Sequence, residues 1–99
     1  MKTTEIAVYK IKPEIISRYD AIRKDALTHL KTHYTGLEQV TMLASEKDPA
    51  LFADILIWKS SADFNHAAGS VMNDPALGAF MECMADSVVF EHFHVTGEL

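Results

Sequence analysis

The sequence predicts an α+β domain in which strands and helices follow the order β-α-β-β-α-β. Stretches rich in β-branched and aromatic residues lie near both ends of the chain, and two more lie in its middle, separated only by a turn. A helical pattern, with apolar residues three and four positions apart, follows the first and the third of these stretches. The alternation of the elements therefore predicts the fold class.

The first part of the chain is expected to form a strand and a long helix. Residues Thr4–Ile11 favour a strand, which Pro13 ends because proline donates no backbone hydrogen bond and suits the first turn of a helix. An amphipathic helix is predicted from Pro13 to Tyr34, and Gly36 is expected to end it in a left-handed backbone conformation. Its predicted apolar stripe is Ile15, Tyr19, Ile22, Ala26 and Leu30.

The middle of the chain is expected to form a hairpin. Leu37–Ser45 and Leu51–Trp58 both favour strands, and only the turn Glu46–Pro49 lies between them. A connection this short predicts an antiparallel pair.

The second helical region is expected to have two parts. Ser60 and Asp63 have the spacing of a capping box, and the helical pattern weakens over residues 69–73. Asp74 and Pro75 then restart a helix as its N-cap and first residue. The stripe that follows, Leu77, Phe80, Met81, Met84 and Val88, is expected to lead into a last strand over Val88–Val95.

These elements predict a ferredoxin-like sheet, with four antiparallel strands and both helical regions on one face. Yet both sides of the strands are apolar, since Ile6 and Val8 point away from Ala7 and Tyr9. Helices cover only one face of such a sheet, and a large uncovered apolar face is usually an interface. The sequence therefore predicts a two-fold symmetric homodimer that pairs two sheets face to face.

Composition excludes several classes of protein. The chain has 99 residues, 48 % of them apolar, and is expected to form one domain over residues 1–99. A net charge of −5 with scattered Lys and Arg argues against nucleic acid as a partner. No apolar run is long enough to cross a membrane, and the single cysteine, Cys83, cannot form an intramolecular disulfide. We therefore expect a cytoplasmic protein.

The run from Trp58 to His66, with the sequence WKSSADFNH, resembles the antibiotic biosynthesis monooxygenase family of the dimeric α/β barrel superfamily. Its members typically have a strand that ends in Trp or Tyr, a short turn with Ser or Glu, a helix with Phe and His, and a second short helix. The matching residues here are Trp58, Ser60, Phe64, His66 and the pair Asp74-Pro75.

The resemblance implies a small-molecule site between the sheet and the helices. Some members of the family oxidise quinols or aromatic polyketides there with O₂ and without metal or flavin, so no cofactor is expected. The heme-degrading branch uses an Asn on its first strand and a Trp and a His in its second helical region. The matching positions here hold Ala7, Ala67 and either Leu77 or Phe80, which argues against heme degradation of that type.

Three residues of this run are the expected catalytic group. His66 could act as a base on a phenol or quinol, Asn65 could orient an oxyanion, and Trp58 could stack on a planar substrate and hold its oxygen. Each has a structural alternative: a surface or capping histidine, an amide that caps the local backbone, and an aromatic of the core or the interface.

Further residues are expected around the same site. Asp54 lies in an otherwise apolar strand, so it has to be paired, at a sheet edge, or functional, because an isolated buried charge is costly. His92 and His94 have the strand spacing of a metal pair, but no third ligand is evident, and pocket-lining or interface histidines are the preferred interpretation. The other predicted substrate-binding residues are Tyr9, Tyr34, Phe80 and Met84.

Three functions follow from these observations. The first is a dimeric, cofactor-independent monooxygenase that acts with O₂ on a small aromatic or quinol-like molecule. The second is a non-catalytic dimer of the same fold that binds a small hydrophobic ligand. The third is a metal-binding protein built on His92 and His94.

Overall fold

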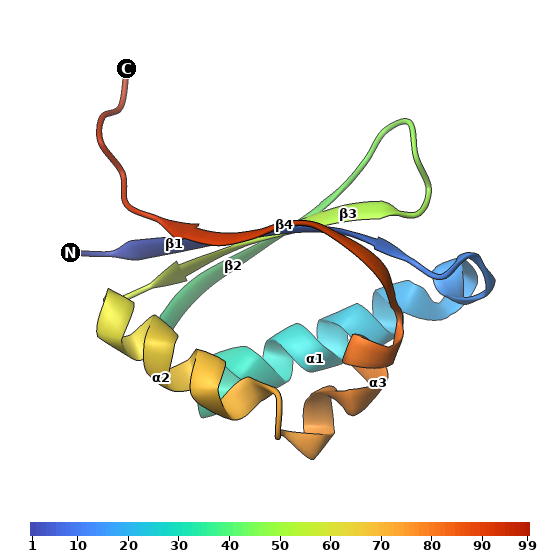
Figure 1. Ribbon diagram of the computed structural model, residues 1–99, viewed down its shortest axis with the longest axis horizontal. Coiled ribbons are helices and arrows are strands. Elements are labelled where there is room, and N and C mark those ends of the chain that lie inside the picture. Colours follow the sequence, from blue (N-terminus) through green and yellow to red (C-terminus); the bar gives the residue numbers. More distant parts are fainter.

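The computed structural model describes residues 1–99 and confirms the predicted α+β fold, with one antiparallel sheet and all helices on one of its faces (Figure 1). The strand order β2-β3-β1-β4 is that of a ferredoxin-like sheet. Residues 94–99 lead away from the sheet. In chain order the elements are β1 (Thr3–Ile11), the 3₁₀ helix η1 (Pro13–Arg18), α1 (Tyr19–His33), β2 (Leu37–Ala44), β3 (Leu51–Trp58), α2 (Ser61–Val71), the 3₁₀ helix η2 (Pro75–Leu77), α3 (Gly78–Glu82) and β4 (Met84–Phe93).

Most of the predicted boundaries agree with this structure. β3 spans the predicted residues, and β1 and β2 each differ by one residue at one end. The predicted capping of the second helical region is also confirmed, because Ser60 accepts a hydrogen bond from the backbone of Asp63, and Asp74 caps η2. The long helix, by contrast, starts as a 3₁₀ helix and becomes α-helical only at Tyr19.

The predicted start of the last strand is wrong. α3 ends at Glu82, and β4 pairs with β1 from Met84 onward rather than from Val88. Pairing with the free edge of β1 satisfies the backbone groups of these residues, and this outweighs the helical spacing of Met81, Met84 and Val88. The strand also ends at Phe93, two residues before the predicted end.

The predicted left-handed conformation of Gly36 is wrong as well, since no residue in the chain has a positive φ. Gly36 is required for a different reason. A Cβ atom at this position would overlap the side chain of Asp63 at the start of α2. The backbone N–H of Lys59 also donates to the Gly36 carbonyl at 2.8 Å, so the turn after α1 packs directly against the start of α2.

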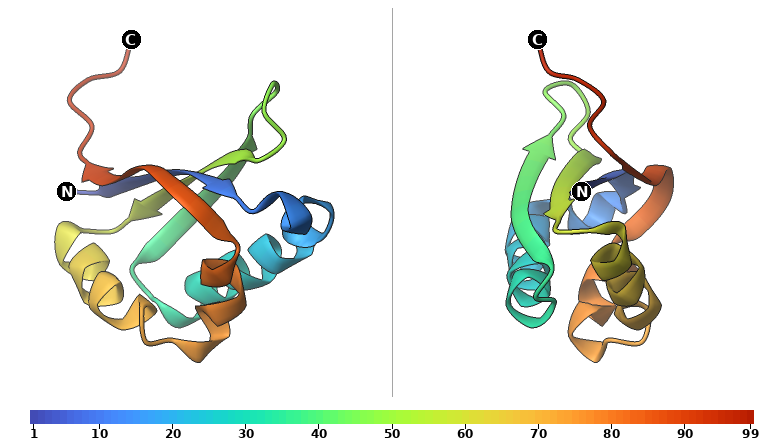
Figure 2. Two further views of the ribbon diagram at one scale, coloured as in Figure 1. Left: turned by 45° about the vertical axis from the view of Figure 1, so that its right-hand side comes forward. Right: turned by 90° about the vertical axis from the view of Figure 1, so that its left-hand side faces the viewer.

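The core lies between the sheet and the helices, which form two groups beneath it, α1 on one side and α2 with α3 on the other (Figure 2). Cys83 belongs to this core; it lies at the junction of α3 and β4, and its thiol donates to the Ala79 carbonyl at 3.2 Å. The buried stripe of α1 includes Arg23 and Leu27 in place of the predicted Ile22; its full set is Tyr19, Arg23, Ala26, Leu27 and Leu30.

The other face of the sheet has no helix over it (Figure 1). Ile6 and Val8 of β1 and Ile55 and Ile57 of β3 point to this face and are only half-buried. The prediction of an uncovered apolar face is therefore confirmed. None of the helices is both long enough and apolar enough to span a membrane.

Candidate functional site

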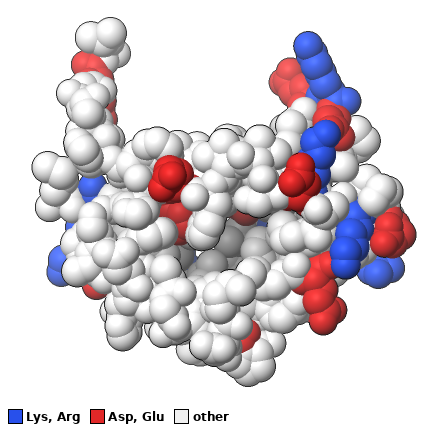
Figure 3. Space-filling view, in the orientation of Figure 1, with Lys and Arg blue, Asp and Glu red and all other residues white.

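A cavity of about 300 Å³ lies between the sheet and the three α-helices. Sixteen of its 20 lining residues are hydrophobic. Figure 3 shows its mouth as a hollow between the sheet and the helices, with the Lys and Arg side chains gathered at the two sides of this face. A concave, largely apolar space with a few polar groups is the usual form of a small-molecule site, although this volume is at the low end of the usual range.

The helix α2 forms one wall of the cavity. Its lining residues Phe64, Ala67, Ala68 and Val71 recur at the spacing of one helical face, and the two alanines leave space beneath the helix. Side chains between these positions point the other way.

The predicted placement of His66 and Asn65 is therefore not found. Both side chains are exposed on the outer side of α2, and neither lines the cavity. Phe64 and Ala67 fix which face of the helix is buried, and that choice turns His66 and Asn65 toward solvent. The catalytic role expected for them stays a prediction without support from this geometry.

Trp58 does line the cavity, but its indole is already engaged. It is 2 % exposed, and its Nε1–H donates to Glu5 Oε1 at 2.9 Å. Its ring also packs edge to face on Phe64, with 6.2 Å between the ring centroids. The indole N–H is thus used to hold a carboxylate of the protein, whereas the sequence predicted that it would hold a substrate oxygen.

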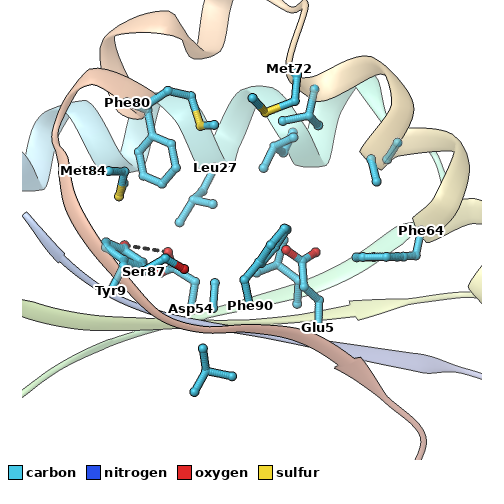
Figure 4. A pocket seen from close by; sticks show the side chains of 18 of the residues that line it. Glu5, Tyr9, Leu27, Asp54, Phe64, Met72, Phe80, Met84, Ser87 and Phe90 are labelled. Atoms are coloured by element: carbon cyan, nitrogen blue, oxygen red, sulfur yellow. Dashed lines mark hydrogen bonds between the residues drawn. The ribbon is translucent and has the colours of Figure 1, made fainter.

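Glu5 is the central polar group of the cavity. It is 9 % exposed, and Figure 4 shows its carboxylate pointing up from the sheet beside Phe90. Burial raises the pKa of Glu5; the Trp58 hydrogen bond opposes this, and the nearby Asp54 adds to it. No fully buried polar side-chain atom in the chain lacks a partner, and Trp58 is the only side chain bonded to Glu5. Its second oxygen is therefore open to the cavity.

Asp54 is the other buried carboxylate on this side of the sheet, and it is fully paired. Its Oδ1 accepts from Arg23 Nη2 at 2.6 Å and Nε at 3.0 Å. Its Oδ2 accepts from the Tyr9 hydroxyl at 2.7 Å, the bond that is dashed in Figure 4. Arg23 Nη2 also donates to the carbonyls of Leu43 and Ala53. Of the interpretations left open for Asp54, the structure supports a paired carboxylate.

The Tyr9 hydroxyl joins this network to α1. Because its one proton goes to Asp54, the Tyr19 hydroxyl donates to the Tyr9 oxygen at 2.6 Å. Burial, followed by the hydrogen bond that it donates to Asp54, raises the pKa of Tyr9, so its phenol stays neutral. Tyr9 lines the cavity as predicted, together with Phe80 and Met84.

The remaining predicted residues lie outside the cavity. The Tyr34 hydroxyl donates to Asp74 Oδ2 at 3.1 Å, on the side of α1 that faces the start of η2. The exposed His92 ring stacks on Phe64 with 4.4 Å between the ring centroids, and His94 lies beyond β4. No group of three His, Cys, Asp or Glu side chains is placed to hold a metal ion.

Two residues of the site, Glu5 and Arg23, were missed from the sequence. Glu5 shares its strand parity with Tyr9 and Ile11, so the alternation could have placed it on the buried face. Arg23 lies three and four residues before Ala26 and Leu27, which also puts it on the buried stripe. Both were obscured because charged residues are rarely buried.

The fold and the cavity define a small ferredoxin-like protein with a largely apolar cavity between its sheet and its helices, and solved structures with this fold are known. SnoaB of Streptomyces nogalater, a cofactor-independent oxygenase, has a TM-score of 0.83 at 12 % identity, over 99 % of this chain and 96 % of its own. A Caulobacter crescentus protein, provisionally named an antibiotic biosynthesis monooxygenase, has a TM-score of 0.79 at 17 % identity, over 97 % of this chain and 91 % of its own. The resemblance in fold to antibiotic biosynthesis monooxygenases is thus confirmed.

Similarity in sequence is much weaker than similarity in fold. No family model matches the chain, and no curated protein is similar to it in sequence. The fold by itself does not fix a chemistry, so the function has to be argued from the cavity.

Proposed function

We propose that the protein is a cofactor-independent oxygenase that acts with O₂ on a small aromatic or quinol-like molecule. The observation that supports this most is Glu5, a buried carboxylate with a raised pKa and one free oxygen in an otherwise apolar cavity. A base of this kind suits the removal of a weakly acidic proton. The shared fold with SnoaB, itself a cofactor-independent oxygenase, supports the same class of reaction.

In the proposed reaction Glu5 takes a proton from a ring hydroxyl, or from a CH₂ group next to a ring carbonyl. The resulting anion is electron-rich and reacts with O₂ to form a carbon–oxygen bond, and Glu5 returns the proton to the peroxide. Loss of water then leaves a carbonyl, so that CH₂ and O₂ become C=O and H₂O. Trp58 orients the carboxylate, while walls such as Leu56 and Phe80 exclude water.

The active form in this proposal is a homodimer. The apolar outer face of the sheet supports it, because an exposed area of this kind is unusual in a monomer. Light scattering is expected to give twice the chain mass, and Ile55→Lys, which puts a charge at the centre of that face, is expected to give a monomer. A wild-type mass of one chain would contradict the dimer.

The single cysteine supports a cytoplasmic location.

A non-catalytic ligand-binding protein is the second candidate. The observation in its favour is that both oxygens of Asp54, the other buried carboxylate in the cavity, are already hydrogen-bonded to Arg23 and Tyr9. Glu5 is then the one carboxylate of the two that is free to act as a base, and without its activity the cavity can only bind a ligand.

Oxygen consumption with a panel of quinols and anthrone-type compounds distinguishes the two candidates. We expect uptake by the wild type and a loss of about 100-fold or more in Glu5→Gln, since general bases typically contribute a factor of that size. The comparison variant is His66→Ala. Activity that survives in Glu5→Gln and is lost in His66→Ala would return catalysis to the residue predicted from the sequence. Binding of these compounds without any oxygen uptake would support the second candidate, a non-catalytic ligand-binding protein.

A further inference from the structure

We propose that the cavity selects neutral molecules with a hydroxyl group and rejects anions, and that Glu5 determines this selectivity. The proposal rests on the proposed function for the site and adds the charge and the functional group of its substrate. It depends on three features of the cavity: the absence of cationic lining residues, the pairing of Asp54, and the free oxygen of Glu5.

The lining of the cavity contains carboxylates but no cation. Glu5, Asp54 and Asp86 are among its residues, whereas no Lys, Arg or His side chain is. His92 lies directly opposite Glu5 on β4, but it is exposed, stacks on Phe64 and does not line the cavity, and it only partly offsets the raised pKa of Glu5. An anionic ligand would find no partner for its charge.

Arg23 cannot supply that partner. Its guanidinium is buried between α1 and the strands β2 and β3, where it binds both Asp54 Oδ1 and the carbonyls of Leu43 and Ala53. Turning it toward a ligand would leave Asp54 as an unpaired buried charge. The charge of Asp54 is thereby neutralised within the protein, whereas Glu5 forms no salt bridge and has only the exposed His92 as a cation nearby.

Glu5 therefore has two opposite effects on ligands. Its free oxygen accepts a hydrogen bond from a hydroxyl group, and a hydrogen bond to a charged acceptor is stronger than one to a neutral acceptor. The same charge repels a carboxylate, and the low polarity of the surrounding walls strengthens the repulsion. A cationic amine would have to be desolvated among apolar residues for a single ion pair, which is costly.

The test uses three ligands that share one ring system: 1-naphthol, 1-naphthoate and 1-(aminomethyl)naphthalene. The chain has a single tryptophan, Trp58, whose indole N–H is bonded to Glu5. Its one indole peak in a ¹H–¹⁵N NMR spectrum therefore reports binding at this site directly. At pH 7 we expect 1-naphthol to bind at least tenfold more tightly than either charged ligand.

Glu5→Gln is expected to bring the affinities of 1-naphthol and 1-naphthoate within about threefold of each other, because it removes the charge and keeps the shape. Glu46→Gln is the matched control, since Glu46 is exposed in the turn between β2 and β3 and does not line the cavity, and it is expected to leave the wild-type ratio unchanged. The wild-type order of the three ligands tests the proposal even if Glu5→Gln fails to fold.

Equal binding of 1-naphthol and 1-naphthoate to the wild type would overturn the proposal, as would tighter binding of the amine or an unmoved indole peak with all three ligands. These outcomes are separate from the oxygenase test. If the ligands bind in the expected order but no oxygen is consumed, the proposed oxygenase function is contradicted and the selectivity is retained. If oxygen uptake depends on Glu5 but 1-naphthol and 1-naphthoate bind equally, the selectivity is contradicted and the oxygenase function is retained.

Discussion

Glu5 and Asp54 lie on neighbouring strands, point to the same side of the sheet and are both buried, yet their surroundings differ sharply. Asp54 receives two N–H groups of Arg23 and the hydroxyl of Tyr9, whereas Glu5 receives one indole N–H. Burial alone therefore does not distinguish a structural carboxylate from a reactive one. The number of partners does, because only a carboxylate with free capacity can bind or deprotonate a ligand.

The largest expected effect on stability is at Asp54, the paired carboxylate. Arg23→Met would leave Asp54 as an unpaired buried charge, which should lower the free energy of unfolding by about 3–5 kcal/mol. Urea unfolding followed by Trp58 fluorescence measures this loss. The control is Lys24→Met, which removes a cation from an exposed pair with Asp20 and should change stability by less than about 1 kcal/mol. Equal losses in the two variants would show that the Asp54 pair is not structural.

At Glu5, by contrast, removing the charge is expected to raise the free energy of unfolding. Its pKa in the folded protein is raised by burial, so the folded state binds the proton more tightly than the unfolded state. The stability that this proton provides is present below the unfolded pKa and is lost as the pH rises through the folded pKa. Glu5→Gln carries no charge at any pH and should therefore be more stable than the wild type at pH 7, by about 0.5–2 kcal/mol.

The pH dependence of that difference is the sharper measurement. Thermal unfolding of Glu5→Gln and the wild type should differ at pH 7 and converge as the pH falls below the ordinary pKa of a glutamate, where Glu5 is protonated in both states. A Glu5→Gln variant that is less stable than the wild type at pH 7 would show that Glu5, like Asp54, is a structural carboxylate.

The smallest expected effect is at the far end of the Asp54 network. Tyr19→Phe removes the hydroxyl that donates to Tyr9 but leaves the Tyr9–Asp54 bond in place. We expect a loss of about 1 kcal/mol, the usual size for one neutral hydrogen bond, in the same urea experiment. A loss as large as that of Arg23→Met would mean that Tyr19 is needed to keep Asp54 paired.

The contrast between the two carboxylates also explains how far the sequence could predict this site. Asp54 stood out because it is the one charged residue within an apolar strand. Glu5 did not, because it follows Thr3 and Thr4 at the start of β1, where polar residues are common. The strands and the hairpin, by contrast, follow from alternation and from the short turn, which are local features of the sequence.

His66 illustrates a second limit. The motif that contains it identifies residue types on a helix, but the face that is buried depends on how that helix packs. Phe64 packs against Trp58, and this contact turns His66 outward. Packing with the rest of the fold also explains why the start of β4 was mispredicted. Its first residues follow a helical spacing but form a strand because the edge of β1 is free to pair with them.

Cys83 offers a way to observe movement of one wall of the cavity. It is 1 % exposed, and burial raises the pKa of its thiol, so it is unreactive while α3 stays in place. Phe80 and Met81 on α3 line the cavity, so the same helix forms part of the cavity wall and shields the thiol. The rate at which a thiol reagent labels Cys83 therefore measures how often this wall opens. A bound ligand that holds α3 in place would lengthen the labelling time, so the labelling of Cys83 also reports whether a ligand is bound in the cavity.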